Sequence, residues 1–285
     1  MMKAVVITGA TSGIGLAVAR ELLEKKYDIL GIGHRQENTK AVWQQLKAEF
    51  PDCFIWYTYG DLMQQSEVKR IAQQLRQVIQ DDCQGQLNAL INNVGCVRSW
   101  YATTQEGYEQ QFALNHLAGF LLTHYLLPYL KKGKGKILFT GSASHKHMKM
   151  RWNDLMFQRR YHPLLAYKQT KLANLLFATA LNERLQGDGV QAYVVDPGLV
   201  NTDIGLKETG GLVKVVWKMR KRGGVSARQA ASTYRMLCEQ LSPAGLYYRF
   251  CKQEPYSKYV TKESAERLFS ISEELCGISF GEEES

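Results

Sequence analysis

Tyr167 and Lys171 lie four residues apart in a stretch whose apolar periodicity predicts a long helix. One helical turn places both side chains on the same face. A phenol with a pKa of about 10 is a poor proton-transfer group at neutral pH. A nearby ammonium stabilises the phenolate and lowers that pKa toward the working range. The pair therefore predicts acid–base catalysis by a tyrosine that a lysine activates.

A glycine-rich turn near the N-terminus suggests a second kind of chemistry. Residues 4–7 are a continuous apolar run, as expected for a buried parallel strand, and Gly9, Gly13 and Gly15 follow before an amphipathic helix. Glycines let main-chain N–H groups approach a pyrophosphate, and the helix N-terminus adds oriented donors and partial positive charge. The turn therefore predicts a dinucleotide site, and a strand-to-helix turn without a ligand is the alternative.

The elements that must position these residues alternate along the chain. Strands are predicted at residues 4–8, 28–33, 53–58, 87–92, 136–141, 190–195 and 246–250. Helices are predicted at 13–25, 38–49, 64–81, 105–131, 165–186, 226–240 and 262–276. This alternation predicts an α/β Rossmann fold, with a doubly wound seven-stranded parallel sheet and helices on both faces. Residues 1–285 form a single domain, and ligands of such a fold bind at the carboxyl ends of the strands.

With the glycine turn and the Tyr–Lys pair among them, four groups of residues along the chain resemble motifs of the short-chain dehydrogenase/reductase family. The first is Thr8-Gly9-Ala10-Thr11-Ser12-Gly13-Ile14-Gly15, which matches the family's TGxxxGxG cofactor loop. Asn92-Asn93-Val94-Gly95 is similar to its NNAG motif, with Val94 in the alanine position. The order and spacing of its catalytic tetrad are matched by Asn115, Ser142, Tyr167 and Lys171. Its PG motif resembles Asp196-Pro197-Gly198-Leu199-Val200 with Thr202, so the resemblance covers about residues 3–202.

The resemblance implies hydride transfer between a nicotinamide and a carbonyl or alcohol, with a role for each residue. Ser142 would polarise the substrate oxygen, and Tyr167 would deliver or remove the proton. Lys171 would lower the pKa of Tyr167 and bind the nicotinamide ribose, while Asn115 would hold a water of a relay to Lys171. Considered singly, each has an ordinary alternative: a strand-end cap, a core aromatic, a surface cation and a buried hydrogen-bonding amide.

The same resemblance implies a set of cofactor contacts along the carboxyl edge. Asp61 and Leu62 would hold the adenine, and the PG motif would pack near the nicotinamide. Besides Tyr167 and Lys171, the remaining predicted contacts are Gly9, Thr11, Ser12, Gly13, Ile14, Gly15, Asn93, Gly95, Pro197, Gly198, Val200 and Thr202.

The end of the second strand indicates which nicotinamide cofactor binds. NAD-binding folds carry an acidic residue there, which accepts from the ribose 2′-OH and would repel a 2′-phosphate. Here the strand ends in Gly33-His34-Arg35-Gln36 without a carboxylate, and the planar guanidinium of Arg35 suits a phosphate. His34 and Arg35 are therefore predicted cofactor contacts, and NADP(H) is favoured over NAD(H). A solvated loop arginine is the alternative.

Three further stretches look like the retinol dehydrogenase-like branch of the family, which acts on hydrophobic carbonyls and alcohols. They are residues 107–130, 159–202 and 265–278. The implied substrate is lipophilic, of retinoid, steroid or aldehyde type. The loop after Ser142 would form one pocket wall through Met148, Met150, Trp152, Leu155, Met156 and Phe157. The alternative is that these side chains close the core.

Residues 203–225 depart from the regular alternation and are predicted to form a substrate lid. Within them, residues 205–224 contain a short basic amphipathic helix bracketed by glycines. Such a helix permits peripheral contact with an anionic membrane, and a lid whose charges are merely solvated is the favoured alternative.

Composition excludes several other classes of protein. The chain has 285 residues, is 45% hydrophobic and carries six scattered cysteines without a CxxC pair, so no metal site or disulfide framework is predicted. Its apolar runs are of strand length and its first strand begins at once, so we expect no membrane span, no signal peptide and a cytoplasmic location. The net charge of +9 is spread along the chain, which argues against nucleic-acid binding.

Two rival functions stay open at this stage. One is a non-catalytic dinucleotide-sensing protein, against which the intact tetrad argues. The other is an NAD-linked hydroxysteroid or sugar-alcohol dehydrogenase. The apolar faces of the helices at 105–131 and 165–186 permit a homodimer without demanding one.

Overall fold

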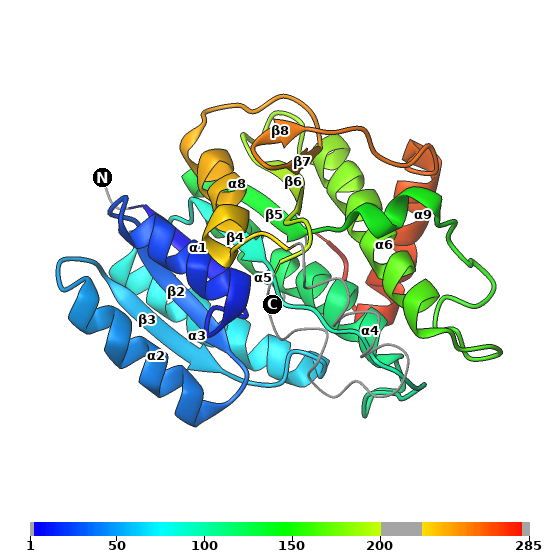
Figure 1. The fold of residues 1–285 in the computed structure, drawn as a ribbon, viewed down its shortest axis with the longest axis horizontal. Coiled ribbons are helices and arrows are strands. Elements are labelled where there is room, and N and C mark those ends of the chain that lie inside the picture. The colour runs from blue at the N-terminus through cyan, green and yellow to red at the C-terminus, as the bar shows by residue number, and fades with distance from the viewer. Residues whose placement is uncertain (1–2, 201–223, 281–285) are drawn as a thin grey trace.

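The fold is seen in a computed structural model that describes residues 3–200 and 224–280 (Figure 1). Thr202 and nearly all of the predicted lid at 203–225, with its basic helix, lie outside the described residues. Within them, no helix combines the length and the apolar content needed to cross a membrane.

The core is an eight-stranded sheet with the order β3-β2-β1-β4-β5-β6-β7-β8. The strands are β1 (Ala4–Thr8), β2 (Asp28–Gly33), β3 (Ile55–Tyr59), β4 (Ala89–Asn92), β5 (Lys136–Thr140), β6 (Gln191–Asp196), β7 (Tyr247–Arg249) and β8 (Lys252–Gln253). The first seven run parallel, which confirms the predicted doubly wound sheet.

The eighth strand was not predicted. β8 pairs antiparallel with β7 through a two-residue turn in which Phe250 and Cys251 have φ values of 49° and 61°. Such a turn usually carries Asn or Gly, because other residues are strained at positive φ. A Phe-Cys pair therefore gives no hairpin signal in the sequence.

Helices cover both faces of the sheet, as predicted. The helical elements are α1 (Gly13–Leu23), α2 (Gln36–Glu49), α3 (Gln65–Asp82), α4 (Gln110–Phe112), the π-helix η1 (Ala113–Leu117), α5 (Ala118–Gly133), the 3-10 helix η2 (Ala143–His147), α6 (Pro163–Arg184), α8 (Ala227–Glu239) and α9 (Lys262–Cys276). α1, α2 and α8 pack on one face, and α3, α5 and α6 pack on the other, with α9 against α6 (Figure 1).

The helix predicted at 105–131 is interrupted near its start. Helical structure begins only at Gln110, where the buried Glu109 carboxylate accepts from the main-chain N–H of Phe112 at 2.8 Å. Residues Ala113–Leu117 are then wound as a π-helix before α5 continues. π-helical turns are rare and often occur at functional sites.

α9 covers the apolar surfaces of α5 and α6. The ring of Phe269 lies 5.3 Å from that of Phe120 and 5.8 Å from that of Phe177. At the edge of this contact, Arg184 pairs with Glu266 at 2.7 Å. The central turns of both helices are buried within one chain, which leaves little apolar surface on them for the homodimer considered above.

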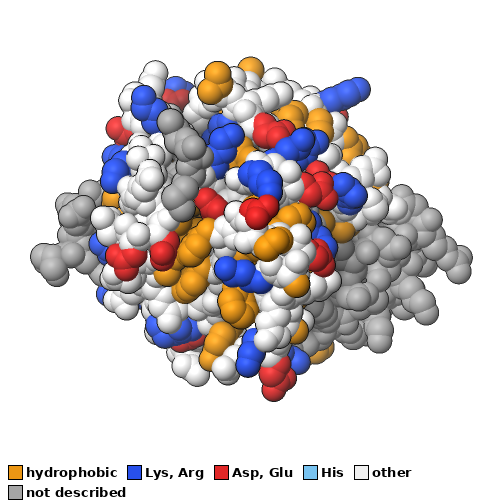
Figure 2. Space-filling model, turned by 90° about the vertical axis from the view of Figure 1, so that its left-hand side faces the viewer, with side chains coloured by type: hydrophobic (Ala, Val, Ile, Leu, Met, Phe, Trp, Pro, Cys, Tyr) orange, Lys and Arg blue, Asp and Glu red, His pale blue; other side chains and the backbone are white. Residues whose placement is uncertain are grey.

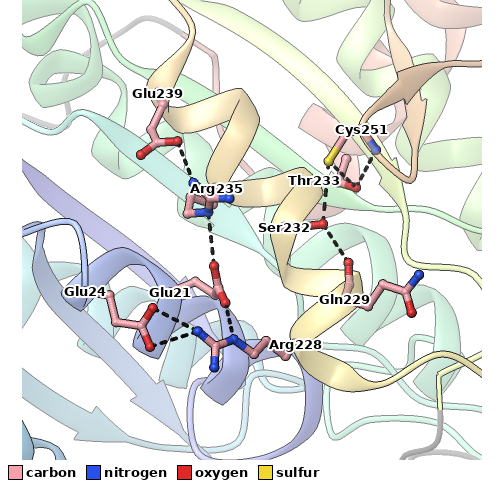
Figure 3. A network of polar contacts seen from close by, with 9 residues as sticks. All are labelled: Glu21, Glu24, Arg228, Gln229, Ser232, Thr233, Arg235, Glu239 and Cys251. Atoms are coloured by element: carbon pink, nitrogen blue, oxygen red, sulfur yellow. Dashed lines mark hydrogen bonds and ion pairs between the residues drawn. The ribbon is translucent and has the colours of Figure 1, made fainter.

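A charged cluster fastens α8 to α1, the helix that follows the glycine turn (Figure 3). Glu21 lies between two arginines, with Arg228 Nε at 2.8 Å and Arg235 Nε at 3.0 Å from its carboxylate oxygens. Glu24 adds a second partner for Arg228 at 3.2 Å. The side chains of Glu21 and Arg235 are 11% and 30% exposed, so their pairing is less screened by water than an ordinary surface ion pair, whereas that of Arg228 is 73% exposed.

Charges are mixed on the side of the molecule that bears α1 and α2. Acidic and basic side chains alternate there with hydrophobic ones and do not gather into a single basic surface (Figure 2). On this side the charges therefore form no continuous basic patch.

Candidate active site

The glycine turn is shaped as a cradle that larger residues would fill. Gly9 and Gly13 have φ values of 67° and 55°, a left-handed conformation that glycine adopts without strain. A Cβ on Gly15 would lie 2.3 Å from the carbonyl oxygen of Gly9, so α1 packs directly on the turn. Ser12 precedes the helix in an extended conformation. Close backbone approach at a helix N-terminus is what a pyrophosphate group requires, so the residues present fit a dinucleotide.

Asn93 ties this turn to the end of β4. The Thr8 hydroxyl accepts from the main-chain N–H groups of Asn93 and Val94, both at 2.9 Å. The Asn93 amide in turn donates to the Thr8 carbonyl at 3.0 Å. The predicted cofactor loop and the Asn93–Gly95 segment therefore lie together at the carboxyl edge of the sheet.

Lys171 is buried at the centre of the site. The residue is only 3% exposed, and its Nζ donates to the carbonyl of Thr140 at 2.8 Å. The same Nζ lies 5.5 Å from the centre of the Tyr167 ring, as the predicted helical spacing requires. Burial lowers the pKa of Lys171 to about 8, against an opposing effect of nearby Cys96 and Asp196.

Asn115 lies in the π-helix and joins three segments. Its amide nitrogen donates to the Cys96 carbonyl and to the Thr170 hydroxyl, both at 3.0 Å, and its Oδ1 accepts from Cys96 N at 2.7 Å. A Cβ on Gly95 would lie 3.2 Å from Asn115 Oδ1 and 3.5 Å from Lys171 Nζ. Oδ1 keeps a second lone pair with which it can accept from a water, as the predicted relay needs.

Ser142 follows β5 after Gly141, two residues beyond the Thr140 carbonyl to which Lys171 donates. It is half-buried and caps η2, where its Oγ accepts from the main-chain N–H of Ser144 at 3.3 Å. Because this bond uses an oxygen lone pair, the hydroxyl hydrogen can still donate to a substrate. Contacts through Gly95 and Thr140 thus bring the four residues of the predicted tetrad to one place.

The PG motif forms a turn beside this group. Asp196 is buried, and its Oδ1 accepts from Gly198 N at 2.8 Å while Tyr247 donates to its Oδ2 at 2.8 Å. Gly198 has φ of 75°, and a Cβ there would lie 2.8 Å from the Phe250 ring. Beyond Pro197, Val200 forms a parallel β-bridge with Val225, so the chain before residue 201 and the chain after residue 223 meet at this edge.

The predicted adenosine contacts lie at the ends of β2 and β3. The exposed Arg35 is the N-cap residue of α2, and no carboxylate among the described residues pairs with its guanidinium. His34 beside it is also exposed. A Cβ on Gly33 would lie 2.8 Å from the Thr11 side chain, so the strand end touches the glycine turn. After β3, Asp61 accepts from Met63 N at 3.1 Å, and Leu62 is buried.

The loop after Ser142 divides between core and surface. Met148 and Phe157 are buried in the core, and Met150, Trp152 and Met156 are partly buried against it. For Met148 and Phe157 the core-closing alternative is therefore the better description. A hollow of about 790 Å³ lies between this loop, at residues 146–151, and residues 255–259, and none of the tetrad lines it.

Some partners of the tetrad could not be found in the sequence. Lys171 hydrogen-bonds the carbonyl of Thr140, and Asn115 hydrogen-bonds main-chain atoms of Cys96. Main-chain atoms leave no signature in residue types.

No metal centre is seen in the described ranges, where no group of three or more His, Cys, Asp or Glu side chains is arranged to hold a metal. His145 is fully buried, and its ring is hydrogen-bonded to the main chain of Ser142.

Comparisons with known proteins show the family to which the chain belongs. The family model described as short chain dehydrogenase matches residues 3–210. The chain is 34% identical to retinol dehydrogenase 12 of Mus musculus over 98% of its own length and 87% of the relative's. It is 29% identical to polyprenol dehydrogenase of Homo sapiens, covering 97% and 86% of the two chains.

Solved structures share the fold. An uncharacterised protein from Mycobacterium paratuberculosis superposes with a TM-score of 0.75 at 27% identity, over 98% of this chain and 95% of that one. A short-chain dehydrogenase from Sphingobium yanoikuyae in complex with NADPH gives a TM-score of 0.67 at 20% identity, over 100% and 99%. Fold, motifs and sequence relatives together place this chain in the short-chain dehydrogenase family, with its likeness to the retinol dehydrogenases confirmed, as an NAD(P)-dependent oxidoreductase that acts on CH–OH groups.

Proposed function

We propose that the protein is an NADP(H)-dependent oxidoreductase that interconverts a lipophilic alcohol and its carbonyl. The observation that carries this proposal is the buried ammonium of Lys171, fixed by Thr140 and set 5.5 Å from the Tyr167 ring. A buried cation in this position favours the phenolate form of tyrosine. A protein that only sensed a dinucleotide would have no use for that pairing.

Each side chain has a defined task in the reaction. When bound, the nicotinamide supplies or accepts the hydride. Tyr167 holds the proton that is delivered to the substrate oxygen during reduction and removed from it during oxidation. The Ser142 hydroxyl donates to the same oxygen, on which negative charge develops during reduction, and a donor placed in advance stabilises that charge.

Arg35 supports the preference for NADP(H). Its guanidinium is exposed at the start of α2, beside a strand end that carries no carboxylate. The planar guanidinium can bind a 2′-phosphate with two parallel hydrogen bonds, which an NAD ribose cannot use. A short-chain dehydrogenase with the same fold is known in complex with NADPH.

The names of the relatives support a lipophilic substrate. Retinol and polyprenol dehydrogenases align with nearly the whole chain, at 34% and 29% identity. Retinol and polyprenols are long apolar alcohols, so we expect the substrate to present one hydroxyl or carbonyl at the end of a hydrocarbon body.

A substrate panel tests the proposal. Retinoids, steroids, aliphatic aldehydes, quinones and short sugar alcohols are incubated with NADPH or NADH, and reduced-cofactor absorbance is followed. We expect turnover with an apolar member of the panel and a higher kcat/KM with the phosphorylated cofactor. Turnover confined to sugar alcohols, or equal kcat/KM with both cofactors, would contradict the respective part of the proposal.

A further inference from the structure

His145 is a fully buried histidine next to the catalytic serine. Its Nδ1 lies 2.6 Å from the carbonyl oxygen of Ser142, and its main-chain N–H donates to the same oxygen at 3.2 Å. The other ring nitrogen, Nε2, accepts from the main-chain N–H of Ser257 at 3.3 Å. Two segments that are distant in sequence, the turn from Ser142 to His145 and the main chain at Ser257, therefore meet at one imidazole.

These contacts fix the protonation state of the ring. A carbonyl oxygen can only accept, so Nδ1 must carry the hydrogen that it shares with Ser142. The N–H of Ser257 can only donate, so Nε2 must be bare. The neutral imidazole with its hydrogen on Nδ1 satisfies both partners at once, and burial lowers the pKa of His145, which favours this neutral form.

The ring is also held from the side. Tyr247 of β7 packs edge-on against His145, with ring centres 4.9 Å apart and planes at 72°. The Tyr247 hydroxyl donates to Asp196, whose other oxygen holds Gly198 of the PG turn. His145 therefore stands between the serine turn and the turn beside the expected nicotinamide position.

We propose that His145 is a positioning residue for Ser142. Its Nδ1–H holds the Ser142 carbonyl, which fixes the main-chain rotation of Ser142 and so directs the Oγ toward the reacting oxygen. The inference deepens the proposed function and rests on it, because Ser142 is taken as the donor to the substrate. An error of about 1 Å in such a donor is enough to reduce turnover a hundredfold.

Two amide substitutions separate the two ring nitrogens. In His145→Asn the amide nitrogen takes the place of Nδ1 and can still donate to Ser142. In His145→Gln the amide takes the place of Nε2 and keeps only the Ser257 contact. We expect kcat of the Gln variant to fall about tenfold or more, and that of the Asn variant to stay within about threefold of the wild type, with NADPH affinity little changed in both.

Several outcomes would overturn the proposal. One is wild-type kcat in both variants, and another is an equal loss of kcat in both. A third is a wild-type ring with its hydrogen on Nε2, which ¹⁵N NMR of labelled histidine detects without any turnover. Absence of wild-type turnover with the whole panel would instead count against the proposed function.

A matched control removes loss of packing as an explanation. His124 is another buried histidine, on α5, whose ring packs on Tyr125 and Phe280. We expect His124→Gln to lower the melting temperature without changing kcat at 25 °C. If the control lost kcat as strongly as His145→Gln, the effect would be general destabilisation and the positioning role would be wrong.

Discussion

The ammonium of Lys171 donates a 2.8 Å hydrogen bond to the carbonyl of Thr140, the last residue of β5. This contact ties the helix that carries Tyr167 to the strand that ends two residues before Ser142. In the proposed mechanism one lysine therefore has two tasks: it activates the Tyr167 phenol, and it connects the helix of the proton donor to the strand that precedes the oxyanion donor. Loss of Lys171 is expected to affect both functions together.

Replacing Tyr167 with Phe should abolish proton transfer and leave the cofactor site intact. We expect kcat to fall by about 10²- to 10⁴-fold, the usual contribution of a general acid or base. NADPH binding, measured by nicotinamide fluorescence, should change little. Tyr129→Phe, on a half-buried tyrosine of α5, is the control and should keep wild-type kcat. Retained turnover in the Tyr167 variant would remove the tyrosine from the mechanism.

The activity should depend on the charge of Lys171. In the free enzyme its pKa is lowered to about 8, so the ammonium is present below that pH and is lost as the pH rises through it. We expect kcat/KM for reduction to decline above about pH 8, with an apparent pKa that belongs to the Lys171–Tyr167 pair. In Lys171→Arg the charge persists beyond pH 12, so any residual activity should lack this decline. The control is Lys25→Arg, on an exposed lysine, which should show the same decline in kcat/KM as the wild type.

Arg35→Ala should change cofactor selectivity without affecting the chemistry. Loss of a charge-assisted pair with a phosphate corresponds to an increase of about ten- to a hundredfold in the Kd for NADPH. The Kd for NADH should stay constant, because NADH has no phosphate at that position. Lys47→Ala, in the last turn of the same helix, serves as the control. A parallel rise of both Kd values would show that Arg35 only supports the fold.

Stability should fall in mild acid because of His116. This buried histidine has a pKa lowered from 6.5 to about 4, since burial disfavours its charged form. Between these two pKa values the unfolded chain binds more protons than the folded one, so stability is complete above pH 6.5 and is lost as the pH falls toward 4. We expect the free energy of unfolding to drop by up to about 3 kcal/mol from this group.

Denaturant unfolding of wild type and His116→Gln at pH 7 and pH 4.5 isolates that contribution. The glutamine amide can replace the 2.9 Å contact of His116 Nε2 with Ser272 but does not titrate. The difference in stability between the two pH values should therefore be smaller in the variant. Equal differences would assign the acid sensitivity to other groups.

The covered helices predict a monomer. The central turns of α5 and α6 are buried, and α9 packs on them through Phe269, so a helix-paired dimer would first have to expose this core. Light scattering on a gel-filtration column should give a mass near 32.4 kDa. A dimer mass would contradict this prediction.

Patterns local in sequence predicted the fold well. Apolar periodicity located the parallel strands and the long helices, because each element must bury one stripe or both faces. The helix at 105–131 was predicted less well, because its π-helical turn is tied to bonds from Asn115 to Cys96, nineteen residues earlier. β8 was missed because its turn lacks the usual residues.

The candidate site likewise contains features that the sequence predicts and contacts that it does not. Glycines that need positive φ, and the Tyr–Lys spacing on one helix, are visible in residue types. The Thr140 carbonyl is not, because any residue offers one. The place of His145 in the site is also invisible, since the sequence cannot show that Ser257 is folded against it from 112 residues away.

α9 has a consequence for how the enzyme is made. Its Ser272 holds His116, the neighbour of Asn115, so one support of the catalytic amide is translated about 150 residues after the amide itself. Domains mature as their segments emerge during synthesis. We therefore expect nascent chains that end before residue 262 to expose the apolar surface that α9 covers, and to need chaperones until α9 is made. Catalytic activity should appear only in chains that contain α9.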